Sequence, residues 1–158
     1  MGQEIKQYKV NRRVRFINRM MARMIHWNIA PPRTYLLTVP GRKSGKPYTL
    51  PVTLVEQDRK RWLVSPFGEV NWVKNARAAG EVSLFRSGHT ETLKIQELGP
   101  EESAPILKTY INLEGIVRPY FTAQPDSPLE DFETEAPRHP VFLLAANEAD
   151  KDPLVSTG

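Results

Sequence analysis

The 158-residue chain contains no cysteine, three histidines and no long apolar run. Without cysteine there can be no disulfide, thiolate metal site, iron–sulfur cluster or cysteine nucleophile. The histidines, His26, His89 and His139, are scattered without ligand spacing, so we expect no metal site. No run approaches the roughly 20 apolar residues of a transmembrane helix, and no secretory signal is visible. We therefore expect a cytoplasmic protein that is soluble or peripheral at a membrane.

Several motifs of catalysis and recognition are also absent. The chain lacks the G-x-S-x-G of serine hydrolases and the G-x-G-x-x-G of dinucleotide-binding folds. It shows no pair of carboxylates at one-face helical spacing that would suit a glycosidase. No nucleic-acid reader motif is present, and the chain beyond residue 33 is acidic overall, so we expect no nucleic-acid partner.

Positive charge is concentrated at the N-terminus. Residues 1–33 hold eight of the 22 Lys and Arg residues and one acidic residue, although the net charge of the chain is only +4. From about Tyr8 to Trp27, apolar residues recur at helical spacing between arginines, which predicts one amphipathic helix ended by Pro31 and Pro32. Its apolar face has two uses that the sequence leaves open. It can pack on the rest of the fold, or attach to an anionic membrane such as the inner face of the cell membrane.

A short basic loop, residues 41–47 (GRKSGKP), lies between predicted strands at 34–39 and 48–55. Gly41 and Gly45 permit positive φ, so main-chain N–H groups could converge on an anion, while Arg42 and Lys43 offer charges for phosphate or carboxylate. The loop is not a P-loop, because only three residues separate its glycines and a strand follows it. We interpret it as an anion cradle, with a solvated hairpin tip as the alternative.

The remaining pattern predicts an α+β fold. Further strands are expected at 61–65, 81–87, 90–98 and 141–146, with helices at 72–79, between Asn71 as cap and Gly80 as stop, and from Pro100 to about 112. This order has antiparallel hairpins and no βαβ repeat, which favours a split antiparallel β-barrel flanked by helices. Pro51 inside the second strand predicts an edge or a bulge.

We expect three parts in the chain. They are a basic amphipathic helix over residues 1–32, a barrel domain over 33–146 and a disordered tail over 147–158. Residues 125–137, rich in Pro and acid, are predicted to be irregular. The sequence leaves the oligomeric state open, a homodimer included.

The stretch that begins at Tyr35 contains three motifs, LLTVPGRKSGKPYTLPVTLV, WLVSPFG and NWVKNARA. With them, residues 35–75 resemble the deazaflavin-dependent nitroreductase family. It implies a split β-barrel that binds coenzyme F420, a deazaflavin with a phospholactyl-polyglutamate tail, and that passes hydride from its reduced form to a quinone, a nitroaromatic or an activated enone. FMN as the cofactor, or a non-catalytic fatty-acid or lipid-binding role, are the alternatives. They stay open because Tyr48 stands where some members have Arg, and a Lys near Pro66 is missing.

The resemblance also implies a set of cofactor-binding residues. They are Arg42, Lys43, Ser44, Gly45, Lys46 and Pro47 in the loop, Tyr48, Leu50 and Pro51 on the next strand, Ser65, Pro66, Phe67 and Gly68 beside the ring, and Trp72 and Asn75 on one helix face. Candidate catalytic donors are Ser65, Tyr110 and Tyr120. From the residues alone, Trp72 is equally a barrel plug, Asn75 a bridge to the main chain and Tyr110 a core residue.

Overall fold

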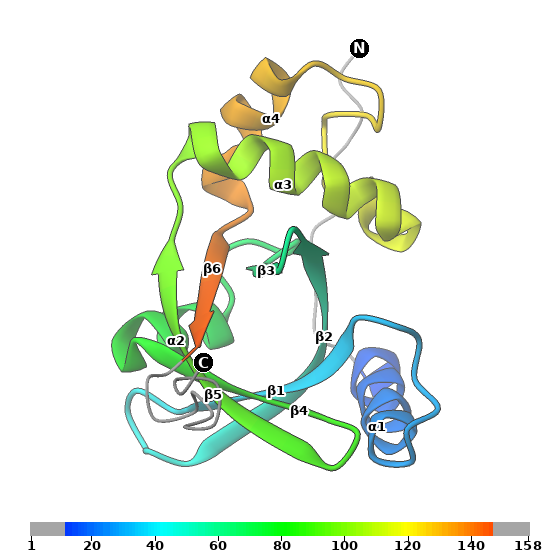
Figure 1. Cartoon of the computed structure of the whole chain (residues 1–158), viewed down its shortest axis with the longest axis vertical. Helices are drawn as coiled ribbons and strands as arrows, with labels where there is room; N and C mark the ends of the chain where they lie inside the picture. Colours follow the sequence, from blue (N-terminus) through cyan, green and yellow to red (C-terminus); the bar gives the residue numbers. More distant parts are fainter. Residues whose placement is uncertain (1–11, 147–158) are drawn as a thin grey trace, which may run out of the picture.

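The computed structural model describes residues 12–146, which form a closed six-stranded antiparallel β-barrel with helices around it (Figure 1). The strands follow the order β1-β2-β3-β6-β5-β4 around the barrel. The predicted α+β class with an antiparallel barrel is confirmed. The expected tail at 147–158 and the start of the predicted N-terminal helix lie outside the described residues.

The elements are α1 (Arg12–His26), β1 (Thr34–Pro40), β2 (Pro47–Gln57), β3 (Lys60–Val64), α2 (Asn71–Ala79), β4 (Glu81–Arg86), β5 (His89–Glu97), α3 (Pro100–Leu113), the 3-10 helix η1 (Gly115–Tyr120), α4 (Leu129–Glu135), the 3-10 helix η2 (Ala136–Arg138) and β6 (Val141–Ala146).

Strand β2 changes partner along its length. Residues 47–53 pair with β1, whereas residues 54–57 pair with β3. The other edge of the first half therefore has no strand beside it. Pro51, which has no N–H to donate, stands in this half opposite Leu36. The edge position predicted for Pro51 is confirmed, and Pro51 also lines a cavity of the protein.

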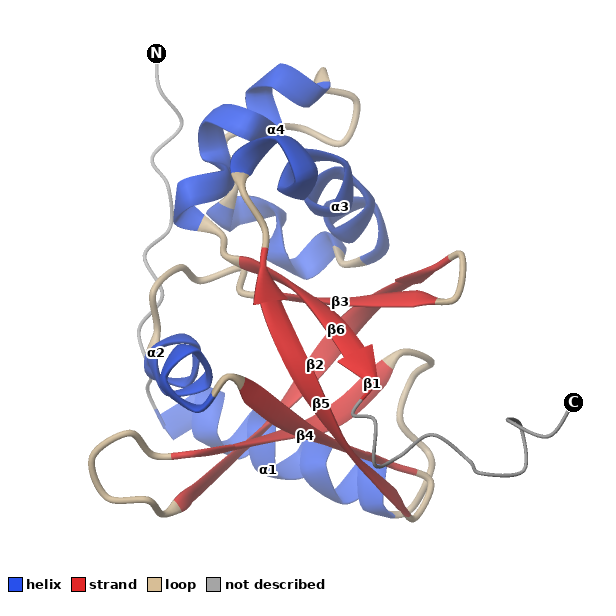
Figure 2. Cartoon of the chain, turned by 60° about the vertical axis from the view of Figure 1, so that its left-hand side comes forward, coloured by secondary structure: helices blue, strands red, loops and turns tan. Residues whose placement is uncertain are grey.

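Two apolar clusters hold the fold together. The first fills the barrel, where Trp72, Val73 and Ala76 of α2 pack among strand residues such as Leu37 and Leu84. The second lies between α3, α4 and the adjoining ends of the strands, and includes Leu107, Ile111, Phe132, Val55, Val64 and Val141. Figure 2 shows α3 and α4 grouped at one end of the barrel and α1 on the opposite side. Helices α1 and α3 thus lie on opposite sides of the free β2 edge.

Helix α1 packs on β1 and β2 through one side only. Ile25 is buried, and Met21 and Met24 are half-buried, whereas Phe16 and Met20 are exposed. The predicted amphipathic helix is confirmed over residues 12–26. No helix in residues 12–146 is both long and apolar enough to span a lipid bilayer.

Two local predictions were wrong. Residues 125–137 are not irregular, because α4 begins after the extended Pro128 and buries Phe132 completely. Asn71 is not the cap of α2: the helix begins at Asn71 after Val70, which offers no side-chain acceptor. The predicted stop at Gly80 is confirmed, since this residue has a φ of 73° and its N–H donates to the Ala76 carbonyl.

Candidate functional site

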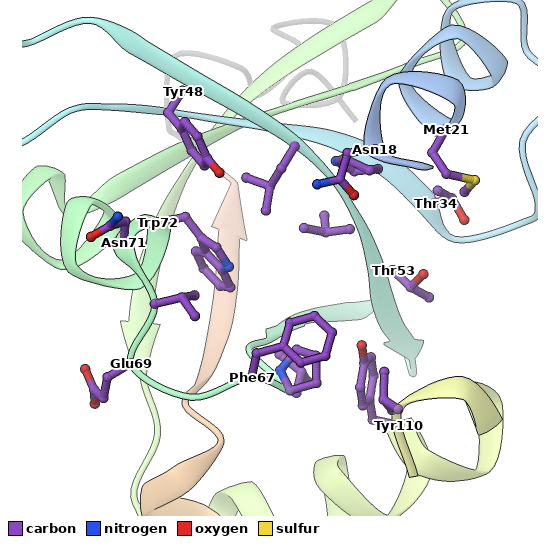
Figure 3. A pocket seen from close by; sticks show the side chains of 17 residues that line it. Asn18, Met21, Thr34, Tyr48, Thr53, Phe67, Glu69, Asn71, Trp72 and Tyr110 are labelled. Carbon is purple, nitrogen blue, oxygen red and sulfur yellow. The ribbon is translucent and has the colours of Figure 1, made fainter. Parts of the chain in front are cut away.

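A cavity of about 470 Å³ opens at the free edge of β2 (Figure 3). We call it the apolar cavity. Its size lies in the usual range for small-molecule sites. The walls come from α1, β2, the loop between β3 and α2, α2 itself and α3, and include Asn18, Met21, Tyr48, Leu50, Pro51, Thr53, Pro66, Phe67, Asn71, Trp72 and Tyr110.

A second cavity of about 440 Å³ lies against the basic loop, and we call it the loop cavity. Tyr48 and Asn71 line both cavities, so the two spaces share a wall. The loop cavity brings together five of the six predicted loop residues, all except Gly45. Its lining residues are Gly41, Arg42, Lys43, Ser44, Lys46, Pro47, Tyr48, Asn71 and Asn75.

Internal hydrogen bonds close the basic loop. The Gly41 N–H donates to the Lys46 carbonyl and the Gly45 N–H to the Gly41 carbonyl, both at 2.8 Å, and the Lys46 N–H donates to Ser44 Oγ at 3.2 Å. Gly45 has the predicted positive φ of 70°, but Gly41 is needed for space, since a Cβ there would lie 2.9 Å from Ser44 Oγ. The predicted convergence of these N–H groups on an anion was wrong, because the loop uses them to hold its own shape.

The charged side chains of the loop are therefore its groups for an anion. Arg42 Nη1 donates to Asn75 Oδ1 at 2.7 Å, and the Arg42 N–H donates to the same oxygen at 3.1 Å. Lys43 and Lys46 make no ion pair within residues 12–146 and are exposed. Three cations thus border one cavity with no carboxylate in its lining.

The loop after β3 presents Pro66 and Phe67 to the apolar cavity. Ser65 is fully buried outside the lining and donates through Oγ to the Gly68 carbonyl at 2.6 Å. Gly68 has a φ of 86°, and a Cβ there would lie 3.3 Å from the Arg138 carbonyl oxygen. Ser65 and Gly68 therefore set the shape of the loop, while their two neighbours form the wall.

Two of the candidate tyrosines differ in their relation to the cavity. Tyr110 lies in the wall, with its hydroxyl directed into the cavity (Figure 3) and with no hydrogen-bond partner in the described part of the chain. Burial, with a smaller contribution from Glu114, raises the pKa of the Tyr110 phenol, so the hydroxyl stays protonated and can donate. Tyr120 is outside the lining and packs edge-on against Phe67, with ring centroids 4.7 Å apart.

Trp72 plugs the barrel, as expected from the residues alone, whereas its contact with a cofactor ring stays a prediction. Its ring is 5% exposed and packs at a tilt against Phe142 in the barrel, and it also lines the apolar cavity. Glu69 at the cavity margin is turned to Arg77, and hydrogen bonds from Arg77 lower the pKa of this carboxyl despite some desolvation.

Some lining residues were missed by the sequence reasoning. Asn71 could have been found, because it stands four residues before Asn75 on the same helix face. Asn18, Met21 and Thr53 gave no local signal, since their approach depends on how α1 docks at the free edge of β2.

The paired cavities suit one kind of ligand. A largely apolar group suits the apolar cavity, and an anionic extension suits the cation-lined loop cavity beside it. Barrel and cavities together place the chain in the split-barrel class. Residues 9–114 match the model of the F420H2-dependent quinone reductase family, and the chain belongs to that family. It is an oxidoreductase, and its cofactor is coenzyme F420.

Several solved structures are similar to the chain at low identity. An F420H2-dependent reductase, FDR-A, is 24% identical over 72% of this chain and 94% of its own, with a TM-score of 0.49. A domain-swapped dimer is 20% identical over 84% of this chain and 98% of its own, with a TM-score of 0.52. A protein of unknown function from Agrobacterium tumefaciens is 18% identical over 72% and 48%, with a TM-score of 0.52. No curated protein matches the chain.

Proposed function

We propose that the chain uses reduced coenzyme F420 to reduce a quinone, a nitroaromatic or an activated enone, with the coenzyme tail in the loop cavity and its ring in the apolar cavity. One observation carries the proposal: Tyr48 and Asn71 line both cavities, so a cation-lined site continues into an apolar one. A coenzyme with an anionic tail and a planar ring needs these two environments in this order.

The chain's residues take three kinds of role in this proposal. The cations Arg42, Lys43 and Lys46, with the Ser44 hydroxyl, bind the anionic tail. Phe67, Trp72 and their neighbours in the wall enclose the ring and exclude water. A final group keeps these surfaces in place, namely Gly45, Pro47, Ser65, Gly68, Asn75 and Tyr120.

Reduced coenzyme F420 supplies the hydride when bound, so the protein needs to orient two molecules and stabilise charge. The Tyr110 hydroxyl is the donor we assign to the acceptor, because it points into the cavity, stays protonated and has no internal partner among the described residues. Ser65 donates to a carbonyl outside the cavity, and Tyr120 lies behind Phe67, so neither takes this role.

Two measurements test the proposal. Titration of the purified protein with coenzyme F420 and, separately, with FMN should give saturable binding for the first only. Addition of menadione or a nitroaromatic should then oxidise reduced F420 catalytically. Preference for FMN would overturn the cofactor assignment. Absence of turnover, with fatty acid found by mass spectrometry in the denatured protein, would favour the lipid-binding alternative.

We also propose that α1 holds the cavity mouth at an anionic membrane surface, from which an apolar acceptor could enter. Phe16 and Met20 are 68% and 46% exposed beside the exposed Arg15 and Arg19. An apolar face bordered by arginines suits the interface of an anionic bilayer. The same helix lines the apolar cavity with Asn18 and Met21. A membrane contact through α1 would therefore bring the cavity close to the lipid surface.

A further inference from the structure

A buried carboxylate–imidazole pair lies behind the wall of the apolar cavity. Glu135 and His139 are 1% and 3% exposed, and His139 Nε2 is 3.1 Å from Glu135 Oε1. The other ring nitrogen, Nδ1, is 2.9 Å from the Pro66 carbonyl oxygen. Phe121 stacks on the imidazole, with centroids 3.8 Å apart and planes 13° from parallel. The pair is thus shielded from water and touches the loop that lines the cavity.

The partners of the imidazole determine its charge. The Pro66 carbonyl can only accept a hydrogen bond, so Nδ1 must carry a proton to make the 2.9 Å contact. An ionised carboxylate also only accepts, so Nε2 must carry a proton as well. Both contacts exist together only if His139 is an imidazolium or if Glu135 is protonated.

The surroundings of Glu135 favour the ionised carboxylate. Its two oxygens accept from the main-chain N–H groups of Thr122, at 2.6 Å, and Ala123, at 2.9 Å. Burial alone would raise the pKa of this carboxyl, but hydrogen bonds from His139 and from these two N–H groups lower it. Arg138 Nη2 lies 3.8 Å from Glu135 Oε1. Within residues 12–146, Arg138 is the charged side chain next to the pair, and it lies beside Glu135. The charged partner of His139 is therefore the negative carboxylate of Glu135.

Residues 138–140 are joined to the cavity loop at three points. His139 Nδ1 donates to the Pro66 carbonyl, the Ser65 N–H donates to the Pro140 carbonyl at 2.9 Å, and the Arg138 carbonyl packs against Gly68. We infer that His139, as an imidazolium paired with Glu135, is a positioning residue that fixes the Pro66–Phe67 wall of the apolar cavity. This inference rests on the proposed function, because it takes that wall to contact the coenzyme ring.

The wall depends on both N–H groups of the imidazolium. A ring with a single N–H could serve only one of the two acceptors, so its contact with either Pro66 or Glu135 would be lost.

The charge state is tested on the unaltered protein. Long-range 1H–15N NMR of the histidine rings at neutral pH should show both nitrogens of His139 protonated, with His26 and His89 as internal comparisons. The signal is assigned by its loss in His139→Asn. A ring with one unprotonated nitrogen would overturn the inference. This measurement requires no coenzyme, so its outcome is independent of the proposed function.

The positioning role is tested by coenzyme titration of two variants. His139→Leu removes both donors and should weaken F420 binding at least about tenfold, the usual effect of a lost charge-assisted hydrogen bond. His139→Asn keeps a neutral donor near the Nδ1 position, so it should retain most of the affinity. Equal affinity of all three proteins would overturn the role.

Phe132→Leu is the matched control, because Phe132 is fully buried on α4 and is not in the cavity lining. It should lower stability without changing F420 affinity, and an equal loss of affinity in this variant would contradict positioning by His139. If His139→Leu does not fold, the ring NMR of the unaltered protein decides: one unprotonated nitrogen overturns the inference. Failure of the unaltered protein to bind F420 would instead overturn the proposed function.

Discussion

Arg42 and Asn75 stand 33 positions apart in the sequence and meet at one atom, since Asn75 Oδ1 accepts from both the main-chain N–H and the guanidinium of Arg42. Asn75 is on α2, one turn from Trp72 in the wall of the apolar cavity. The basic loop and this wall are therefore fixed to the same helix. The distance between the two cavities is therefore fixed before a ligand that spans them binds.

Replacing Asn75 should loosen the loop without removing a charge. Asn75→Ala deletes both hydrogen bonds to Arg42, so we expect F420 affinity to fall about tenfold, as for the loss of one or two hydrogen bonds. Binding is measured by fluorescence titration. Asn112→Ala is the control, because within residues 12–146 that side chain bonds to the main-chain carbonyls of Lys108 and Pro125 and lines neither cavity. Unchanged affinity in Asn75→Ala would mean that the loop keeps its shape unaided.

Removing two loop charges should weaken coenzyme binding more strongly and in a salt-dependent way. Arg42→Ala with Lys43→Ala should lower F420 affinity at low salt by at least about two orders of magnitude, because each charge-assisted contact contributes about 1.5–3 kcal/mol. The difference should shrink as salt rises. The melting temperature should change little, since both side chains are exposed.

The β2–β3 turn offers a matched control for that pair. Arg59→Ala with Lys60→Ala removes the same two charges from another exposed hairpin that lines neither cavity. Equal losses in the two double variants would show that net charge, rather than the loop, attracts the coenzyme.

The elements were easier to predict from the sequence than the site. Gly80 and the strand pairs were predicted correctly because local turn chemistry and alternation determine them. Helix α4 was missed because its burial of Phe132 is a long-range effect within a polar segment. Likewise, nothing near Asn18 or His139 in the sequence indicates that each reaches the surroundings of one cavity. The oligomeric state stays a prediction.

Tyr110→Phe tests the assigned donor. The change removes one oxygen that has no partner in the described chain, so stability should be unchanged or slightly higher. If the hydroxyl donates to the acceptor, kcat should fall about 10- to 100-fold while F420 affinity stays the same. Tyr120→Phe, behind Phe67, is the comparison and should lose less. A normal kcat in Tyr110→Phe would remove this residue from the chemistry.

Vesicle binding tests the exposed face of α1. The intact protein should co-sediment with anionic vesicles at low salt and dissociate at high salt, because arginines and apolar side chains act together. Phe16→Ser with Met20→Ser should abolish binding and leave the fold intact, since both side chains are exposed. Ile116→Ser, which removes an 82% exposed apolar side chain on η1, should have no effect. Absence of binding by the intact protein would refute the membrane proposal.

Because β2 is paired on one side only over residues 47–53, ligand binding in the apolar cavity should affect local opening of the barrel. Residues 47–53 are hydrogen-bonded to a strand on one side only, and segments with fewer such bonds open locally at lower cost. A molecule seated against that edge would suppress the opening, and binding to the native state alone raises the unfolding free energy with ligand concentration. Slower amide exchange in residues 47–53 and a higher thermal midpoint of the protein would then reveal any molecule bound in the cavity. This includes an electron acceptor whose reaction is unknown.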